Sequence, residues 1–403
     1  MTIRLDDVQE RAVELAATER LLVLTGGPGC GKTTICREVL RRLDARGRRI
    51  LCATPTGKAA KRFSEQTGTQ ASTIHRLLGW STAAGGFTYN RQNPLPCDAL
   101  VLDECSMVDT LLMAAVLDAL PRGASLLLVG DADQLPSIGP GNVLRDIIAS
   151  DAVPVTRLER VYRQSPESWI NINAQRINRG EAVHVDNDRA EDFFFLDREE
   201  PTVVAEEILR LVTRAIPERH GLQAVRDIQV LCPQWKGAIG VHHFNHELQA
   251  ALNPRVMGTK EWTLPGEQGA LRVGDKVIHT RNDYALGVMN GEVGLVSDID
   301  RDHLTVDYDD RLVEYDRAAA IQLRLCYATT VHKSQGSEYP CVVVPVHSYN
   351  AFMLSRPLLY TAVTRGKRLV YLVGDKKGLR RAIRNNEVVE RYTGLADLLR
   401  RSA

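Results

Sequence analysis

The stretch Leu21-Leu-Val-Leu-Thr-Gly-Gly-Pro-Gly-Cys-Gly-Lys-Thr33 joins a short apolar run to a glycine-rich turn and then to a helical pattern. From Gly26 onward it fits the spacing G-x-x-x-x-G-K-[ST]. Glycines at this spacing let backbone N–H groups wrap around phosphate oxygens, and the positive end of the following helix attracts the same anion. The stretch therefore predicts a buried strand, a phosphate-binding turn and a helix that begins near Lys32.

Short apolar runs alternate with helical patterns on both sides of this turn. The runs of strand length are Leu21–Leu24, Ile50–Ala53, Ala99–Leu102 and Ser125–Val129. Helical spacing occupies Lys32–Ala45 and Thr110–Leu120, with Gly47 and Pro121 at their ends. This alternation indicates an α/β fold with a doubly wound parallel sheet. We expect this first lobe to span residues 1–152.

A second set of strand-like runs predicts a second α/β lobe over residues 153–403. These runs are Asp227–Leu231, Arg324–Tyr327, Cys341–Val344 and Arg368–Leu372. Residues 81–95, with Gly85-Gly86, predict a small hairpin in the first lobe. Residues from about 261 to 318 alternate around Asn290-Gly291, which predicts a small β-barrel inserted in the second lobe.

The composition narrows the class of protein. The chain has 403 residues and a net charge of +1, so a surface for an anionic polymer must be local. No apolar run reaches membrane-spanning length, and the N-terminus lacks the apolar core of a signal peptide. The eight cysteines include no C-x-x-C pair, which fits buried thiols in a reducing compartment. We therefore expect a cytoplasmic protein without membrane contacts.

Two carboxylates extend the phosphate site. Asp103-Glu104 follows a buried strand, at the sheet edge where ligands bind in such folds. With ATP in the turn, Lys32 would reach the β- and γ-phosphates, and Thr33 and Asp103 would hold Mg²⁺. Glu104 would orient and deprotonate the attacking water. The alternative interpretations are a glycine-rich turn that matches by chance and an Asp-Glu pair in a solvated turn. Because both motifs follow buried strands in the same chain, neither alternative is favoured.

Further segments in order along the chain resemble those of superfamily 1 helicases. They are Asp103-Glu-Cys-Ser106, Gly130-Asp-Ala-Asp-Gln134, Val331-His-Lys-Ser-Gln-Gly-Ser-Glu338 and Tyr360-Thr-Ala-Val-Thr-Arg365. The pattern is most similar to the RecD-like branch of the 5′-to-3′ class, which also includes phage Dda helicase. The resemblance covers nearly the whole chain. It implies two tandem RecA-like lobes, an SH3-like insertion in the second, and an ATP-dependent DNA helicase that moves 5′ to 3′ on single-stranded DNA.

The resemblance also implies roles for individual residues. Gln9 would read adenine, Tyr162 would stack on it, and Gln134 would link the γ-phosphate to the DNA. Arg163 and Arg365 would be arginine fingers. The other implied nucleotide contacts are Gly27, Pro28, Gly29, Cys30, Gly31, Lys32, Thr33, Thr34, Gly336 and Glu338.

Single-stranded DNA and single-/double-strand junctions are the partners that the family implies, bound by a monomeric motor. Hydroxyls, cations and helix N-termini grip phosphates without reading sequence. The implied contacts are Thr54, Pro55, Thr56, Lys58, Thr73, His75, Thr330, His332, Lys333 and Ser334. Residues 81–95 would form a pin that splits the duplex, with a plain surface loop as the alternative.

Other functions stay open at this point. The chain could be a translocase that unwinds poorly, an RNA helicase, or an ATP-switched DNA-binding module without net movement. Glu104 and the two arginines argue against the switch, because a switch can lose them. A P-loop metabolite kinase is a weaker alternative, since it would need neither the second lobe nor the Gln134 motif.

Overall fold

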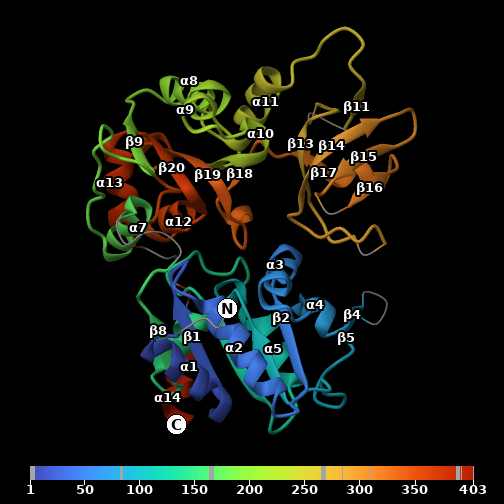
Figure 1. Cartoon of the computed structure of the whole chain (residues 1–403), viewed down its shortest axis with the longest axis vertical. Helices are drawn as coiled ribbons and strands as arrows, with labels where there is room; N and C mark the ends of the chain where they lie inside the picture. Colours follow the sequence, from blue (N-terminus) through green and yellow to red (C-terminus); the bar gives the residue numbers. More distant parts are fainter. Residues whose placement is uncertain are drawn as a thin grey trace. The chain divides into compact units, whose positions relative to one another are not determined.

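A computed structural model describes residues 5–81, 85–162, 168–264, 269–283, 285–309, 311–386, 391 and 393–402. The chain divides into two compact units (Figure 1). Unit 1 contains Met1–Glu167 and Val388–Ala403, and unit 2 contains Ser168–Glu387. Each unit is an α/β body around a parallel sheet, as the sequence predicts.

Unit 1 is built on six parallel strands in the order β3-β2-β6-β7-β1-β8. The strands are β1 Leu21–Gly26, β2 Ile50–Thr54, β3 Ala71–Thr73, β6 Ala99–Leu102, β7 Ser125–Gly130 and β8 Val155–Leu158. The helices are α1 Asp7–Thr18, α2 Lys32–Asp44, α3 Gly57–Thr67, α4 Ile74–Leu77, α5 Thr110–Ala119 and α6 Val143–Ser150.

Alternating side chains bury both faces of this sheet. On β6, Ala99 and Val101 join a core cluster with α1 and α2, whereas Leu100 and Leu102 join a second cluster with α5 and α6. Successive residues of a strand point to opposite faces, so an apolar run without polar alternation needs helices on both. This explains why uninterrupted apolar runs predicted the sheet correctly.

The predicted hairpin of the first lobe is present. Strands β4 (Trp80–Ser81) and β5 (Gly86–Phe87) pair antiparallel, with the Trp80 and Phe87 ring centroids 4.9 Å apart. Residues 82–84 lie outside the described residues. The Trp80 and Phe87 rings also contact His75 of α4, with ring centroids 6.5 Å and 6.0 Å apart, so three aromatic rings hold these two-residue strands against α4.

Unit 2 contains a parallel five-stranded sheet in the order β18-β10-β19-β20-β9. These strands are β9 Phe193–Asp197, β10 Ile228–Cys232, β18 Ala328–Thr330, β19 Tyr339–Val346 and β20 Gly366–Gly374. The helices are α7 Trp169–Arg179, α8 Pro201–Arg210, α9 Ile216–His220, α10 Ala224–Asp227, α11 Val241–Leu252, α12 Arg356–Val363 and α13 Lys376–Arg384.

A smaller antiparallel body is inserted in unit 2, with its own core around Leu271, Val277 and Tyr315. Its five-stranded sheet has the order β16-β15-β14-β13-β17. The strands are β13 Lys276–His279, β14 Val293–Ile299, β15 Leu304–Asp307, β16 Leu312–Tyr315 and β17 Leu323–Leu325, and β11 Glu261–Thr263 pairs with β12 Ala270–Arg272. The predicted small barrel is therefore confirmed.

The strand predicted over Arg324–Tyr327 is wrong. Arg324 and Leu325 belong to β17, where they pair antiparallel with Ile278 and Val277 of the inserted body. The strand of the parallel sheet is the next one, β18, after a break at Cys326. The insertion thus reaches beyond residue 318, because β17 closes its sheet.

The observed division also differs from the boundary placed after residue 152. Strand β8 pairs with β1, so its residues belong to unit 1. Residues 391–402 return to unit 1, where Leu395 and Leu399 of α14 (Leu395–Ser402) pack against its core. In Figure 1 the red α14 lies among the elements of unit 1.

Two further expectations concern cysteines and membranes. All eight cysteines are free and buried. Among the residues that the structure describes, no helix has the length and apolarity needed to cross a membrane.

Candidate nucleotide and nucleic-acid sites

The glycine-rich turn connects β1 to α2 at the carboxyl edge of the unit 1 sheet. Lys32 Nζ donates hydrogen bonds to the carbonyl oxygens of Gly26, at 2.6 Å, and Gly27, at 2.8 Å. Gly31 precedes α2 with φ +86°, and no side chain caps the helix there. The first N–H groups of α2, which include those of Thr33 and Thr34, therefore have no side-chain acceptor and are available to an anion.

Gln9 and Tyr162 lie beside this turn. A Cβ on Gly31 would be 2.6 Å from Gln9 Nε2 and 3.9 Å from Tyr162 Cδ2. The Tyr162 amide donates to the Gly29 carbonyl at 2.8 Å, and its half-exposed ring faces solvent. Its hydroxyl donates to Asp6, which lowers the pKa of that carboxyl. The structure thus brings together an amide and an exposed aromatic ring next to a phosphate-type turn.

Asp103 and Glu104 follow β6. The Asp103 carboxylate accepts from the Glu104 amide at 2.8 Å. Burial raises the pKa of Asp103, the Glu104 charge raises it further, and Lys32 lowers it. Glu104 adopts φ +55°, a backbone conformation that is costly outside glycine and that gathers at functional sites.

Gln134 follows β7, which lies between β6 and β1 in the sheet. Its Nε2 donates to Asp131 Oδ2 at 3.0 Å, while its Oε1 is buried with no hydrogen-bond partner among the described residues. An unsatisfied buried amide oxygen is costly unless a ligand or water supplies the donor. Lys32, Asp103, Glu104 and Gln134 therefore occupy the ends of three neighbouring parallel strands.

The candidate DNA contacts of unit 1 follow β2 and β3, which are also neighbours. Thr54 and Thr73 are paired in register. Thr56 caps α3 and Thr73 caps α4 through their side-chain oxygens. Thr54 is fully buried and donates to the Thr56 carbonyl at 2.7 Å, so its side chain holds the turn. Pro55 lies between β2 and α3, Lys58 is in the first turn of α3, and His75 is in α4.

The corresponding residues of unit 2 follow β18. Thr330 accepts from the Lys333 amide at 3.3 Å, and fully buried Ser334 donates to the Val331 carbonyl. Burial lowers the pKa of both His332 and Lys333. The Lys333 ammonium group is therefore a partly desolvated positive charge in this turn.

Arg365 is almost fully buried in unit 2. Its guanidinium donates to the Thr361 carbonyl at 3.2 Å, the Ser337 carbonyl at 3.1 Å and Thr364 Oγ1 at 3.3 Å. Gly336 has φ +71°, and Glu338 lies 3.5 Å from Lys367 Nζ. The structure thus brings Arg365 next to the 336–338 segment that the sequence singled out. Arg163 lies outside the described residues.

Three family models match the chain. An AAA domain matches residues 9–140, a UvrD-like helicase C-terminal domain matches 325–373, and an ATP-dependent RecD-like DNA helicase SH3 domain matches 244–308. The subunit RecD of the RecBCD enzyme from Mycobacterium tuberculosis is 34% identical over 425 residues, which cover 96% of this chain and 72% of that protein. The chain belongs to the RecD-like branch of the superfamily 1 helicases, a family of ATP-dependent DNA helicases.

Relatives of this RecD-like chain differ in length. The ATP-dependent RecD2 DNA helicase of Deinococcus radiodurans is 39% identical over 393 residues, so the chain spans about half, 52%, of that relative. Pif1 helicase from Bacteroides, solved with ADP-AlF3 and single-stranded DNA, has a TM-score of 0.60 at 19% identity, with 99% of this chain and 97% of that one covered. This likeness supports the RecA-like fold.

The structure also reveals a contact that sequence reasoning missed. Trp235 follows β10, and its side chain is 43% exposed. Lys333 Nζ lies 5.0 Å from the centroid of its ring, and the His242 ring is 5.6 Å away. Tyr349, which follows β19, is also exposed. Because β18, β10 and β19 are adjacent and parallel, Lys333, Trp235 and Tyr349 share one edge of this RecD-like sheet.

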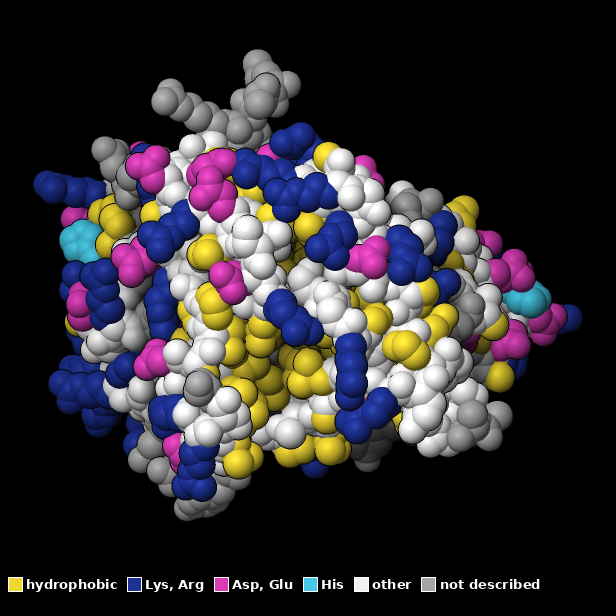
Figure 2. All heavy atoms as spheres, turned by 90° about the horizontal axis from the view of Figure 1, so that it is seen from below, with side chains coloured by type: hydrophobic (Ala, Val, Ile, Leu, Met, Phe, Trp, Pro, Cys, Tyr) yellow, Lys and Arg dark blue, Asp and Glu magenta, His cyan; other side chains and the backbone are white. Residues whose placement is uncertain are grey.

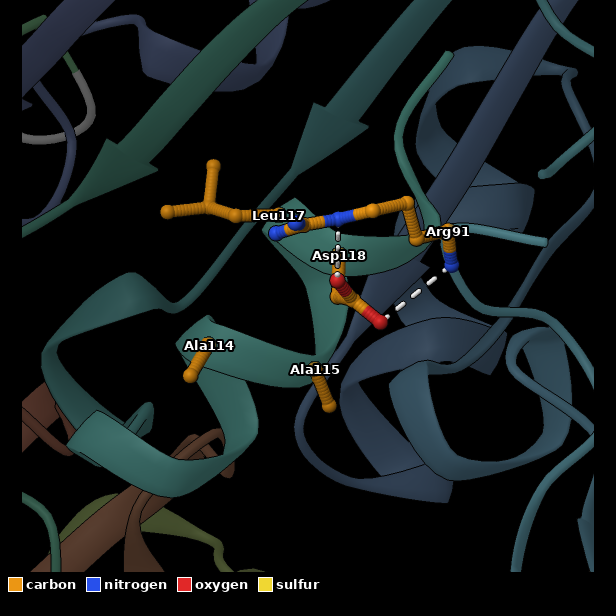
Figure 3. A pocket seen from close by; sticks show the side chains of 5 residues that line it. All are labelled: Arg91, Ala114, Ala115, Leu117 and Asp118. Carbon is orange, nitrogen blue, oxygen red and sulfur yellow. Dashed lines mark hydrogen bonds and ion pairs between the residues drawn. The ribbon is translucent and has the colours of Figure 1, made fainter.

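Unit 1 also has a shallow hollow away from the phosphate turn, but its charged side chains are already paired with each other. It is lined by Arg91, Ala114, Ala115, Leu117 and Asp118, and Arg91 Nε lies 3.1 Å from Asp118 Oδ1 (Figure 3). Figure 2 shows Lys and Arg side chains interspersed with Asp and Glu on the face that it displays. This mixture agrees with the net charge of +1 and gives no broad basic field there.

Proposed function

We propose that this chain is an ATP-driven motor that moves 5′ to 3′ along single-stranded DNA and separates strands at single-/double-strand junctions. The observation that carries the proposal is the edge formed by β6, β7 and β1, which presents Asp103, Glu104, Gln134 and Lys32 together. Open α/β sheets bind ligands at this carboxyl edge. A glycine-rich turn beside two carboxylates suits hydrolysis of a nucleoside triphosphate better than binding alone.

ATP is the proposed fuel, with Mg²⁺. Its phosphates would contact the turn from Gly27 to Thr34, and Gln9 and Tyr162 would face the adenine. The hard oxygen donors of Thr33 and Asp103 suit Mg²⁺, which neutralises charge on the β- and γ-phosphates when bound. The uncapped N-terminus of α2 supports this placement of the phosphates.

Glu104 is the proposed general base. It would accept a proton from water as the water oxygen attacks the γ-phosphorus and the bond to the bridging oxygen of ADP breaks. Gln134 Oε1, which has no protein donor among the described residues, would accept a hydrogen bond from the same water. Through this hydrogen bond, the conformation of the loop after β7 would depend on whether a γ-phosphate is present.

Arg365 and Arg163 are the proposed cations for the transition state. The Arg365 guanidinium bonds Ser337 and Thr361 in unit 2, so recruitment to a phosphate would exchange those acceptors. Such an exchange would move the segment that carries Gly336 and Glu338. ATP binding would thus rearrange unit 2 at the positions next to its DNA-contact turn.

The proposed DNA track uses the carboxyl edges of both sheets. In unit 1 the caps of α3 and α4 present helix N-termini beside Thr56, Lys58 and His75. In unit 2 Lys333 supplies charge, and Trp235 supplies a surface on which any base can stack. Alternate grip by the two units during each ATP cycle would give net movement of a monomer.

Streptavidin displacement tests this motor directly. Oligonucleotides that carry streptavidin at the 3′ or the 5′ end are incubated with enzyme and ATP, with Glu104→Gln as the inactive control. A 5′-to-3′ motor clears the 3′ end faster, and Glu104→Gln clears neither. Binding of DNA without displacement from either end would support an ATP-switched binding module, and faster clearance of the 5′ end would reverse the polarity.

Matched RNA and tailed-duplex substrates separate the remaining alternatives. An RNA helicase would clear the RNA oligonucleotide faster than the DNA one. A translocase with little unwinding activity would clear streptavidin but leave a 5′-tailed DNA duplex intact. The proposed helicase does both on DNA.

A further inference from the structure

The loop that follows Gln134 is clamped by two elements of unit 1 that are far apart in the sequence. On one side, Gly139 and Gly141 lie directly against the start of α5. A Cβ at Gly139 would be 2.0 Å from Asp109 Oδ2, and one at Gly141 would be 1.9 Å from Thr110 Oγ1. The Thr110 amide also donates to the Pro140 carbonyl at 2.9 Å. This side of the loop has no space for movement toward α5.

Arg391 holds the other side. Its Nη1 lies 2.7 Å from the Gly139 carbonyl, 2.6 Å from the Gly141 carbonyl and 3.1 Å from Ser137 Oγ, and its Nη2 lies 2.5 Å from the Ser137 carbonyl. One planar guanidinium thus satisfies three backbone carbonyls within five residues of the loop. A lysine has a single nitrogen and would not reproduce this fork.

Arg391 belongs to a segment that follows unit 2 in the chain. Thr393 Oγ1 donates to Asp146 Oδ2 at 2.7 Å, and Arg400 Nη2 donates to the Ala149 carbonyl at 2.6 Å, so the segment is docked along α6. On the other side of the connection, Asn385 is fixed in unit 2, where its carbonyl accepts from the Arg356 amide at 2.7 Å. Five residues, 386–390, separate these two anchor points.

That spacing limits how far the anchors can separate. Six steps of a fully extended chain reach roughly 20 Å. A change in unit 2 that extended this connection fully would pull on Arg391 before any other described residue of the docked segment. The next groups to respond would be the carbonyls of Ser137, Gly139 and Gly141, which lie three to seven residues after Gln134.

We propose that Arg391 is a positioning residue that sets the 134–141 loop and, through the 386–390 connection, couples that loop to unit 2. The inference rests on the proposed motor function, since it concerns how the DNA-dependent state of unit 2 reaches Gln134. The proposed coupling operates through the backbone of the loop, which Arg391 bonds at Ser137, Gly139 and Gly141.

Two variants and a matched control test the coupling. Arg391→Ala removes the clamp, and a Gly-Ser-Gly-Ser insertion between residues 386 and 387 lengthens the connection while Arg391 stays in place. Arg400→Ala is the control, because Arg400 also binds a unit 1 carbonyl from the same segment but does not reach the loop. The readouts are ATP hydrolysis with and without single-stranded DNA, DNA affinity, melting temperature, and hydrogen exchange of residues 134–141.

Arg391→Ala and the insertion should each lower the stimulation of ATP hydrolysis by DNA by about fivefold or more, the lower range of coupling between sites. Hydrolysis without DNA and DNA affinity should stay within about twofold, and only Arg391→Ala should speed hydrogen exchange in the loop. Arg391→Lys should resemble Arg391→Ala in stimulation, which keeps the test valid if the alanine variant folds poorly.

Three results would overturn the coupling: unchanged stimulation in Arg391→Ala, unchanged stimulation after the insertion, or an equal loss in Arg400→Ala. A wild-type enzyme that DNA does not stimulate contradicts the motor itself, and then the hydrogen-exchange comparison of Arg391→Ala with Arg400→Ala still decides whether Arg391 sets the loop. The two failures are therefore distinguishable.

Discussion

Gly31 leaves the space that Gln9 occupies: a Cβ on Gly31 would lie 2.6 Å from Gln9 Nε2. Gly31 also has φ +86°, which a side chain would strain. Gln9 is held in place by its own helix start, where its Oε1 accepts from the Asp6 amide at 3.2 Å. The glycine therefore serves both the phosphate turn and the position of the proposed adenine-reading amide.

Gly31→Ala should displace Gln9 and weaken ATP binding. We expect KM for ATP to rise by about tenfold, the effect of one lost hydrogen bond at the upper end of the usual range. Gly47→Ala is a matched control, since Gly47 has φ +70° at the other end of α2 but nothing within 4 Å of an added Cβ. Both variants should lose about 1 kcal/mol of stability from backbone strain, measured by denaturant unfolding. Equal KM values in the two variants would contradict the role of the Gly31–Gln9 contact.

Trp235→Ala should weaken single-stranded DNA binding. Stacking of one base contributes about 1–3 kcal/mol, so Kd should rise by about tenfold, and Trp235→Phe should restore most of the affinity. Lys333→Ala should instead reduce the slope of log Kd against log salt by about one unit, because it removes one phosphate contact. Fluorescence anisotropy over a salt series measures both. A tryptophan variant with unchanged affinity would exclude Trp235 from the track.

Glu38→Gln should change stability in a pH-dependent way. Hydrogen bonds from Arg41 and Arg42 lower the pKa of Glu38 to about 2 from an ordinary value of 4.5. A depressed folded-state pKa means that the ion pairs stabilise the fold fully above pH 4.5 and lose this effect as the pH falls toward 2. The difference in unfolding free energy should stay below about 1 kcal/mol, since the pairs are partly exposed.

Urea unfolding of wild type and Glu38→Gln at pH 7, 4.5 and 3 measures this effect. The difference should be largest at pH 7 and shrink at lower pH. Glu65→Gln on α3, for which the structure shows no ion pair among the described residues, should give no such trend. A difference that grows as the pH falls would contradict the assignment.

The local parts of the fold were predictable because one strand or one turn carries the signal. The apolar run Ala99–Leu102 is buried on both faces, which a continuous apolar pattern indicates directly. The glycine spacing of the phosphate turn likewise encodes backbone geometry, as Gly29 and Gly31 both have positive φ. Parallel strands share a carboxyl edge, so the sequence also predicted that the residues after β1, β6 and β7 lie at the same edge of the sheet.

The parts that depend on distant pairing were not predictable. β17 and β18 are short strands separated by two residues, and only the antiparallel partner β13 assigns the first of them to the inserted body. Arg391 lies in a charged stretch typical of a solvated surface, and its role depends on carbonyls about 250 residues earlier. Trp235 gave no signal by itself, since its meaning comes from Lys333 on an adjacent strand.

ATP hydrolysis by wild type and Glu104→Gln, each with and without single-stranded DNA, tests most directly whether this site powers a DNA-dependent motor. We expect DNA to stimulate hydrolysis by the wild type strongly. Glu104→Gln should lose about two orders of magnitude of hydrolysis, typical of a missing general base, while its DNA affinity persists. Robust hydrolysis that ignores DNA, or a Glu104→Gln variant as active as wild type, would contradict a DNA-dependent motor powered at this site.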